Sequence, residues 1–408
     1  MYTLARLRRD FSVILLILPL LVACTGGAGP NGPPGPTPLP HTQLSLTRGP
    51  YLQDMTDSAV TLVWRTAAAT QGGVAIRPAA DAAAGFTMHA EPASTADHVL
   101  RVSGLQPATA YRYAVLAADG ELGEEAEFRT APASKEAPGA PTPFTFAVWG
   151  DSGCGCPQQT AVAAQIARAG ADLLLHTGDV IYERGEANLY DPRFFVPYRA
   201  TLAAAPVYPV LGNHDVATAN GAPWLQAFFL PGDGGRHTTR YYAFNYGNAH
   251  FIALDSEEPY GPTSAQYGWL LQDLQSPAAQ GATWRFAFFH RPPYSSGLGH
   301  GSEYDLRETW APLFERFGVD MVFSGHEHNY ERSTPRRDYA SVGGTHAVIY
   351  IVTGGGDSQT YNVGRQPWSA FAAMAYHYVR IRLDGPRLAL QAIGTDGQVI
   401  DHLELTHP

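Results

Sequence analysis

Charged side chains are scarce in this sequence. They make up 16% of its 408 residues, and acidic residues outnumber basic ones to leave a formal net charge of −10. The composition therefore offers no basic surface of the kind that binds nucleic acid. Cysteine is rarer still, with three residues in the chain, and the apolar run from residue 11 to residue 23 is too short to span a bilayer. What remains is a chain long enough for two domains, each with its own core.

The first 23 residues have the organisation of an export signal. A positively charged start, with Arg6, Arg8 and Arg9, precedes the short apolar run. The run closes on Leu-Val-Ala-Cys, ending at Cys24, and this tetrapeptide resembles the bacterial lipobox. The resemblance implies cleavage just before Cys24, membrane attachment through a lipid on its thiol, and location in the bacterial cell envelope, at the periplasmic face or the outer surface. The alternative is an ordinary secretory signal in which the cysteine is incidental.

The composition changes three times between residues 24 and 143. Residues 24–42 are rich in Gly and Pro without an apolar period, which is typical of a tether. Residues 43–132 contain short alternating strands separated by turn residues, which predicts an all-β domain. Around Tyr111 this domain resembles the tyrosine corner of a fibronectin type III sandwich, in which the hydroxyl bonds to the backbone upstream. Residues 133–143 form a linker by composition, and we expect the all-β domain to pack against the domain that follows.

Residues 144–408 alternate apolar strands with helical patterns at 158–169 and 303–317, which predicts sheets with helices outside. Five apolar runs end at residues that could bind a metal: 144–149 before Asp151, 173–177 before Asp179, 207–211 before Asn213, 285–289 before His290, and 321–324 before His326 and His328. An isolated His-x-His pair is more often a solvated loop, but five such runs in order are not chance. Sites in α/β sheets form at the carboxyl ends of strands, so we expect these side chains to meet. Neutral imidazoles are common metal ligands, so the pair His326 and His328 predicts a binuclear site in which each ring binds a different metal ion.

These five blocks resemble the metallophosphoesterase signature, and Tyr182, just after the second block, narrows the resemblance to the purple acid phosphatases. The resemblance covers roughly residues 44 to 408 and implies an α/β/β/α sandwich for residues 144–408. It also implies two metal ions bridged by Asp179. One ion would be held by Asp151, Asp179, Tyr182 and His328, and the other by Asp179, Asn213, His290 and His326.

The resemblance implies hydrolysis of a small phosphate ester, with acid phosphatase activity as the first expectation. Two ions about 3.5–4 Å apart can lower the pKa of a bound water and direct the resulting hydroxide in line with the leaving group. A phenolate ligand such as Tyr182 favours Fe(III), and the second ion would be Fe, Zn or Mn. His214 would act as general acid, Asp215 could orient it through its other ring nitrogen, and His300 would bind substrate. The alternatives are that His214 only supports the ligands and that His300 is simply exposed.

Several alternatives stay open. A phosphodiesterase or nucleotidase of the same fold would use the same ligands. A surface-binding lipoprotein could keep the fold without turnover, but it would be expected to lose ligands, and none is lost here. Cys154 and Cys156 could form a strained disulfide, remain free thiols or bind a metal. No protein partner can be inferred.

Overall fold

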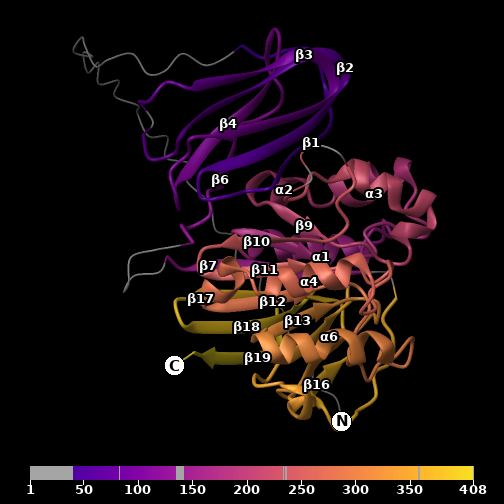
Figure 1. The fold of residues 1–408 in the computed structure, drawn as a ribbon. Coiled ribbons are helices and arrows are strands. Elements are labelled where there is room, and N and C mark those ends of the chain that lie inside the picture. Colours follow the sequence, from indigo (N-terminus) through magenta and orange to yellow (C-terminus); the bar gives the residue numbers. More distant parts are fainter. Residues whose placement is uncertain are drawn as a thin grey trace, which may run out of the picture. The chain divides into compact units, whose positions relative to one another are not determined.

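The computed structural model describes residues 40–81, 83–134, 142–232, 234, 237–356 and 359–407 (Figure 1). The predicted export signal, Cys24, nearly all of the tether and most of the 133–143 linker lie outside the described residues. No helix within the described ranges is long and apolar enough to cross a membrane.

The first described part of the chain, up to residue 134, consists of strands without any helix among its described residues. Its elements are β1 (Leu46–Gln53), β2 (Ala59–Pro78), β3 (Thr87–Ser103), β4 (Ala110–Ala117), β5 (Gly120–Glu121) and β6 (Ala126–Arg129). Strand β2 pairs antiparallel with β1, β3 and β4, and register shifts interrupt its pairing with β3. β2 and β3 have 20 and 17 residues, so they are longer than the short strands we expected. The Tyr111 hydroxyl accepts the Gln106 N–H at 2.8 Å, which is the upstream contact expected at residue 111.

Two further sheets form the second part of the chain. The first has the order β19-β18-β17-β7-β8-β9 and the second has the order β10-β11-β12-β13-β15-β14-β16. The first sheet contains β7 (Phe144–Trp149), β8 (Leu173–His176), β9 (Val207–Pro209), β17 (His377–Asp384), β18 (Arg387–Gly394) and β19 (Val399–Thr406). The second contains β10 (Tyr242–Tyr246), β11 (Ala249–Ala253), β12 (Trp284–Phe288), β13 (Met321–Ser324), β14 (Tyr330–Ser333), β15 (Ile349–Thr353) and β16 (Ser369–Ala373). The five strands predicted to end on ligands are all present, and β7, β8 and β9 run parallel, as do β12 and β13.

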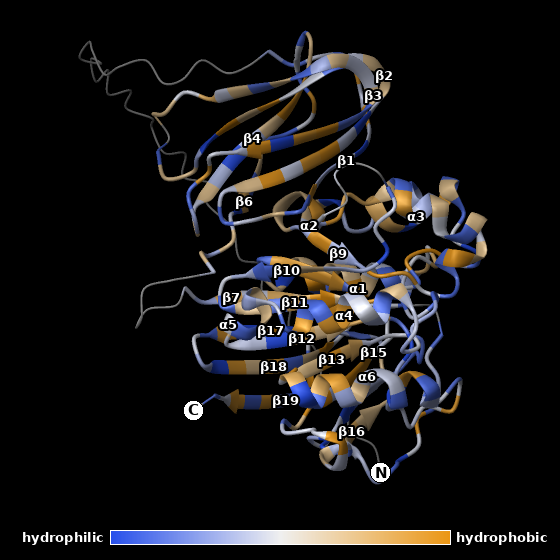
Figure 2. Cartoon of the chain, in the orientation of Figure 1, coloured by the Kyte–Doolittle hydropathy of each residue, from blue (hydrophilic) through white to orange (hydrophobic). Residues whose placement is uncertain are grey.

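The two sheets pack face to face through aromatic side chains. Phe146 of β7 lies 5.2–6.1 Å from three rings of the other sheet, with steep angles between the ring planes; these are Phe251, Phe286 and Phe323. Edge-on contacts of this kind are favourable because the positive edge of one ring meets the negative face of another. Strand β13 is buried on both faces, which explains its continuous apolar sequence (Figure 2).

Helices cover the outer faces of both sheets. α1 (Pro157–Arg168) packs on β17 and β18. α4 (Ala265–Leu274) and α6 (Tyr304–Phe317) bury Leu270 and Trp310 against Val322 on the outer side of β13 (Figure 1). The order of layers is therefore α/β/β/α, as the sequence resemblance implied. The other helices are short: α2 (Arg199–Ala204), α3 (Ala222–Ala227), α5 (Pro277–Gly281), and the single turns at 187–189, 191–195, 215–217, 219–221 and 340–342.

Hydrogen bonds join the N-terminal sheet to the two-sheet part. The Tyr51 hydroxyl donates to the Ala227 carbonyl at 2.7 Å, and the Tyr113 hydroxyl donates to the Ala203 carbonyl at 2.8 Å. The described residues between 40 and 407 accordingly belong to one compact unit.

Candidate metal centre

Both sheets contribute to the candidate site. Asp151, Asp179 and Asn213 follow the carboxyl ends of β7, β8 and β9, whereas the three candidate histidines follow β12 and β13; they are His290, His326 and His328. The sequence indicated strand ends but not their division between two sheets. Because the sheets face each other, their carboxyl ends meet at one edge of the sandwich, and the ligands come together there.

The first group of side chains surrounds the Tyr182 hydroxyl. Its oxygen lies 3.0 Å from His328 Nε2, 3.1 Å from Asp179 Oδ2 and 3.4 Å from Asp151 Oδ1. His328 Nε2 is in turn 3.5 Å from Asp151 Oδ1. The structure thus brings together the four residues expected at the first metal.

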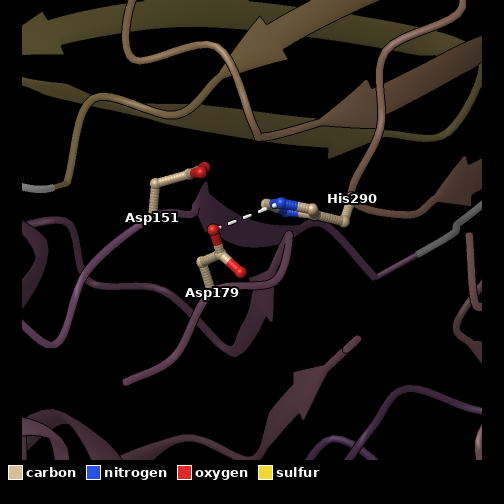
Figure 3. Close-up of side chains that lie close together, drawn as sticks. All are labelled: Asp151, Asp179 and His290. Carbon is tan, nitrogen blue, oxygen red and sulfur yellow. Dashed lines mark ion pairs between the residues drawn. The ribbon is translucent and has the colours of Figure 1, made fainter. Parts of the chain in front are cut away.

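The second group surrounds His290. Its Nε2 atom lies 3.0 Å from Asn213 Oδ1, 3.2 Å from His326 Nδ1 and 3.3 Å from Asp179 Oδ2. These are the four residues expected at the second metal. Asp179 belongs to both groups, and Figure 3 shows its carboxylate between Asp151 and His290. Ligand atoms of these three residues all lie within 4.8 Å of one another.

The backbone around the site is unusually close-packed. Asp151, Asp179 and His326 have φ values of 54°, 52° and 69°, a conformation that side-chain-bearing residues rarely adopt. A Cβ atom on Gly212 would collide with Asp179 Oδ1, and one on Gly325 would collide with Asp151 Oδ2. The glycines before Asn213 and His326 therefore let these two loops approach the carboxylates of Asp179 and Asp151.

The hydrogen bonds of the histidines show that these residues fit metal ions. His290 Nδ1 lies 3.0 Å from the Thr177 carbonyl, and His328 Nδ1 lies 2.8 Å from the Gln359 carbonyl. A carbonyl can only accept, so Nδ1 carries a proton in both rings, and a neutral ring then has its lone pair on Nε2, facing the other candidate ligands. His290 Nε2 faces the oxygens of Asn213 and Asp179, and His328 Nε2 faces the Tyr182 hydroxyl and an oxygen of Asp151. A buried set of carboxylates, ring nitrogens and a phenol that converge in this way suits cations placed between them.

Electrostatics lead to the same conclusion. Burial alone would lower the pKa of His290, but the adjacent Asp179 carboxylate outweighs burial and raises that pKa to about 10. Burial, reinforced by His290, depresses the pKa of His326 far below its ordinary value. With protein groups alone, His290 has to supply the positive charge that the carboxylates demand, and a metal ion supplies it without a proton.

The three residues expected to act on substrate lie in different settings. His214 is next to the ligands: its Nε2 is 4.0 Å from Asp179 Oδ2, its Nδ1 is 2.6 Å from the Glu183 carbonyl, and its side chain is 32% exposed. His300 is exposed, and its ring stacks on His326 with centroids 4.0 Å apart.

The expected contact between Asp215 and His214 is wrong. Asp215 is fully buried, and its oxygens accept backbone N–H groups from Val180, Ile181 and Gly212. His214 Nδ1 is taken by the Glu183 carbonyl instead. The short turn that begins at Asp215 points its carboxylate toward the backbone N–H groups of the loops after β8 and β9. Asp215 therefore holds these loops in position and does not orient the His214 imidazole. Burial, with the nearby Asp179 charge, raises the pKa of Asp215 to about 8.

Two residues near the site were missed in the sequence. Glu327 stands between the two terminal histidines, is fully buried, and accepts the backbone N–H groups of His300 and Gly301. Tyr361 lies flat on the His328 ring, with centroids 4.2 Å apart and planes 6° apart. The position of Glu327 between two candidate ligands could have marked it as a residue of the site. No sequence pattern around Tyr361 indicates its contact with His328.

Comparisons with known proteins agree with this geometry. The family model described as calcineurin-like phosphoesterase matches residues 144–330. Acid phosphatase type 7 of Danio rerio is 30% identical over 302 residues, which are 64% of this chain and 67% of that protein. This chain belongs to the purple acid phosphatase-like metallophosphoesterases. Purple acid phosphatase 15 of Arabidopsis thaliana is 29% identical over 295 residues, 64% of this chain, but the chain spans only 54% of that relative's length.

Solved structures share the fold of this metallophosphoesterase. A purple acid phosphatase, PPD1 from yellow lupin (Lupinus luteus) seeds, superimposes with a TM-score of 0.73 at 20% identity, over 91% of this chain and 75% of its own. PhoD superimposes with a TM-score of 0.65 at 17% identity, over 90% of each chain. Both alignments extend beyond the residues of the family model, so the likeness in fold includes strands outside 144–330.

Proposed function

We propose that this protein is a binuclear-metal hydrolase of phosphate esters and, most directly, an acid phosphatase acting on monoesters. The convergence of seven side chains into two groups that share Asp179 carries the proposal. The family supports it, because its named relatives are acid phosphatases. A phosphodiesterase or nucleotidase of the same fold is the second candidate, since the same ligands serve both reactions.

Each group of ligands would hold one ion. Asp151, Tyr182 and His328 would hold the first and Asn213, His290 and His326 the second, with Asp179 between them. We assign Fe(III) to the Tyr182 group, because a phenolate is a hard ligand, and Fe, Zn or Mn to the other. When bound, such a pair supplies an activated water and neutralises the phosphoryl oxygens.

His214 is placed to move a proton. The Glu183 carbonyl accepts from its Nδ1, which fixes the ring so that Nε2 lies beside Asp179 and at the edge of the site. A protonated ring has N–H groups at both nitrogens, so Nε2 can give its proton to the departing ester oxygen while Nδ1 stays bonded. Partial exposure leaves Nε2 within reach of a substrate. His300, exposed and stacked on His326, would contact the substrate from the other side.

The N-terminal part would serve structure and location. We assign the all-β domain to the fibronectin type III class, supported by the tyrosine-corner contact at Tyr111. We also propose that Cys24 is lipidated and holds the enzyme at the cell envelope. Mass spectrometry of the mature protein should find a diacylated or triacylated N-terminal cysteine, and Cys24→Ser should abolish it. A lipid-free mature protein would contradict the anchor but leave the hydrolase intact.

The function is tested by rates on protein of known metal content. We expect two ions per chain and hydrolysis of nitrophenyl phosphate faster than that of bis(nitrophenyl) phosphate. His326→Ala should lose metal and activity together, whereas His402→Ala, an exposed histidine of β19, should keep both. A protein with two ions and no esterase activity would contradict the proposal, and a faster diester rate would favour the second candidate.

A further inference from the structure

Cys154 and Cys156 form a disulfide that closes over a single residue. We propose that this disulfide is a site of thiol–disulfide exchange with a dithiol reductant, and that its opening changes the position of the loop carrying Tyr182. The second part rests on the proposed function, because its effect is read as a change in turnover.

The disulfide is poorly suited to a purely structural role. A disulfide stabilises a fold mainly by restraining the unfolded chain, and in that account the restraint grows with the length of the closed loop. Here the sequence separation is 2, so very little chain is restrained. Both cysteines are only partly buried and Gly155 between them is exposed, so a small dithiol or a protein dithiol can approach the sulfurs.

The surroundings favour the released thiolates. Cys156 is the N-cap of the 12-residue helix α1, and its side chain makes no capping hydrogen bond. The positive end of a helix stabilises a thiolate, which makes Cys156 the better leaving group. The Cys156 N–H also points at Cys154 Sγ, 3.3 Å away, and would donate to that sulfur as a thiolate.

The exchange balances with a dithiol as the only co-reactant. One thiolate of the reagent attacks Cys154 Sγ, the protein S–S bond breaks, and its electron pair leaves on Cys156 Sγ. The second thiolate of the reagent then attacks the mixed disulfide at the reagent sulfur and releases Cys154. The reagent is oxidised to its disulfide, and its two protons are available to the two cysteines.

Direct contacts link this disulfide to Tyr182. The Gly155 N–H donates to Gln159 Oε1 at 2.8 Å, and Gln159 Nε2 donates to the Arg193 carbonyl. Arg193 in turn donates to the Tyr182 carbonyl at 2.6 Å, and the Tyr182 N–H donates to the Gly153 carbonyl at 3.4 Å. The backbone of Tyr182 is therefore linked to the disulfide on one side through Gly153, the residue before Cys154, and on the other side through Arg193 and Gln159. Release of that segment alters the phenol position at the candidate metal site.

In the experiment, the purified full chain is treated with dithiothreitol, and the reagent is removed by gel filtration without air. The free thiols and bound metal ions are then counted, and the rate of nitrophenyl phosphate hydrolysis is measured. We expect two thiols more than in untreated protein, alkylation of both Cys154 and Cys156, and an unchanged circular dichroism spectrum. The rate should fall about 2- to 30-fold, the range in which linked sites modulate one another, and it should recover on reoxidation.

The double variant Cys154→Ser/Cys156→Ser is the control, because it meets the same reagent without the disulfide. Its rate should not respond to dithiothreitol. The proposal that this disulfide exchanges with a dithiol is refuted if the two thiols appear only after the protein is unfolded. The link to Tyr182 is overturned if the double variant responds as strongly as wild type, or if two thiols appear with no change in rate. Thiol counts do not depend on turnover, so a protein inactive in both redox states would contradict the proposed function and not the exchange site.

Discussion

Glu327→Ala should loosen the loop that presents His300. The Glu327 carboxylate is fully buried, and it accepts the N–H groups of His300 and Gly301 and, at 3.4 Å, that of Gly299. Hydrogen bonds to a charged partner contribute about 1.5–3 kcal/mol each. The two short bonds alone would therefore put the loss of unfolding free energy at about 3–6 kcal/mol if the loop could not move.

The loop at residues 299–301 can move, however, and its movement reduces the expected loss of unfolding free energy. Gly299 and His300 are exposed, so their N–H groups can turn to water once the carboxylate is gone. We therefore expect a loss of only about 1–3 kcal/mol in unfolding free energy, the cost of a few unmade buried bonds. The larger effect should be a raised KM, because the His300 ring would no longer be held against His326.

Urea unfolding and steady-state kinetics on metal-loaded protein measure the two effects. Glu124→Ala is the matched control: this glutamate is exposed in the loop between β5 and β6, and its removal should change the free energy of unfolding by no more than about 0.5 kcal/mol. Unchanged KM and unchanged unfolding in Glu327→Ala would refute the reasoning. A loss of metal with unchanged KM per loaded site would show that Glu327 supports the flanking histidines instead.

Three other substitutions test separate parts of the structure. Tyr182→Phe should abolish the visible charge-transfer band of an Fe(III)–phenolate, and absence of that band in wild-type protein loaded with Fe(III) would rule Tyr182 out as ligand. His214→Ala should keep both metals and slow alkyl phosphates about 10²–10⁴-fold, far more than nitrophenyl phosphate, because a poor leaving group needs its proton; equal slowing of both, with chemistry rate-limiting, would assign it an orienting role. Burial alone would raise the pKa of Asp401, but its hydrogen bonds from Arg332 and Tyr330 outweigh burial and hold that pKa below its ordinary value. A depressed carboxyl pKa gives stability above the unfolded value of about 3.9 that is lost as pH falls. Asp401 and Arg332 are only partly shielded from solvent, so Asp401→Asn should cost about 1–2 kcal/mol of unfolding free energy at pH 7, and the deficit should shrink below pH 4; a deficit independent of pH would contradict the ion pair.

Much of the scaffold could be predicted because buried parallel strands have continuous apolar sequences. The run Phe144–Trp149 coincides with β7 and Met321–Ser324 with β13. Several strands were not predicted, and two of them, β16 and β19, lie at sheet edges and carry partly exposed residues at many positions. Six of the seven candidate ligands could be found because they closely follow apolar runs, and Tyr182 was found through the family resemblance.

The residues that organise the ligands could not be found in this way. Glu327 holds backbone from 26 to 28 residues away, and Tyr361 reaches His328 across a loop, so neither contact leaves a local pattern. The predicted contact of Asp215 with His214 was wrong for the opposite reason. Its position beside His214 suggested a side-chain contact, but the turn there sends the two side chains to different partners. Adjacency in sequence predicts proximity of backbone and not the direction of side chains.

Because the candidate ligands come from both sheets, ion binding at the proposed centre would be coupled to the alignment of the two sheets. An ion at about 100 times its Kd adds about 2.7 kcal/mol to the stability of the state that binds it. That state is the one in which the two sheets are in register, and Phe146 with its aromatic neighbours sets their spacing. A change such as Phe146→Leu, well inside the core and touching no ligand, would then weaken ion binding. The apolar interior would in that sense contribute to the affinity of the proposed centre for its ions.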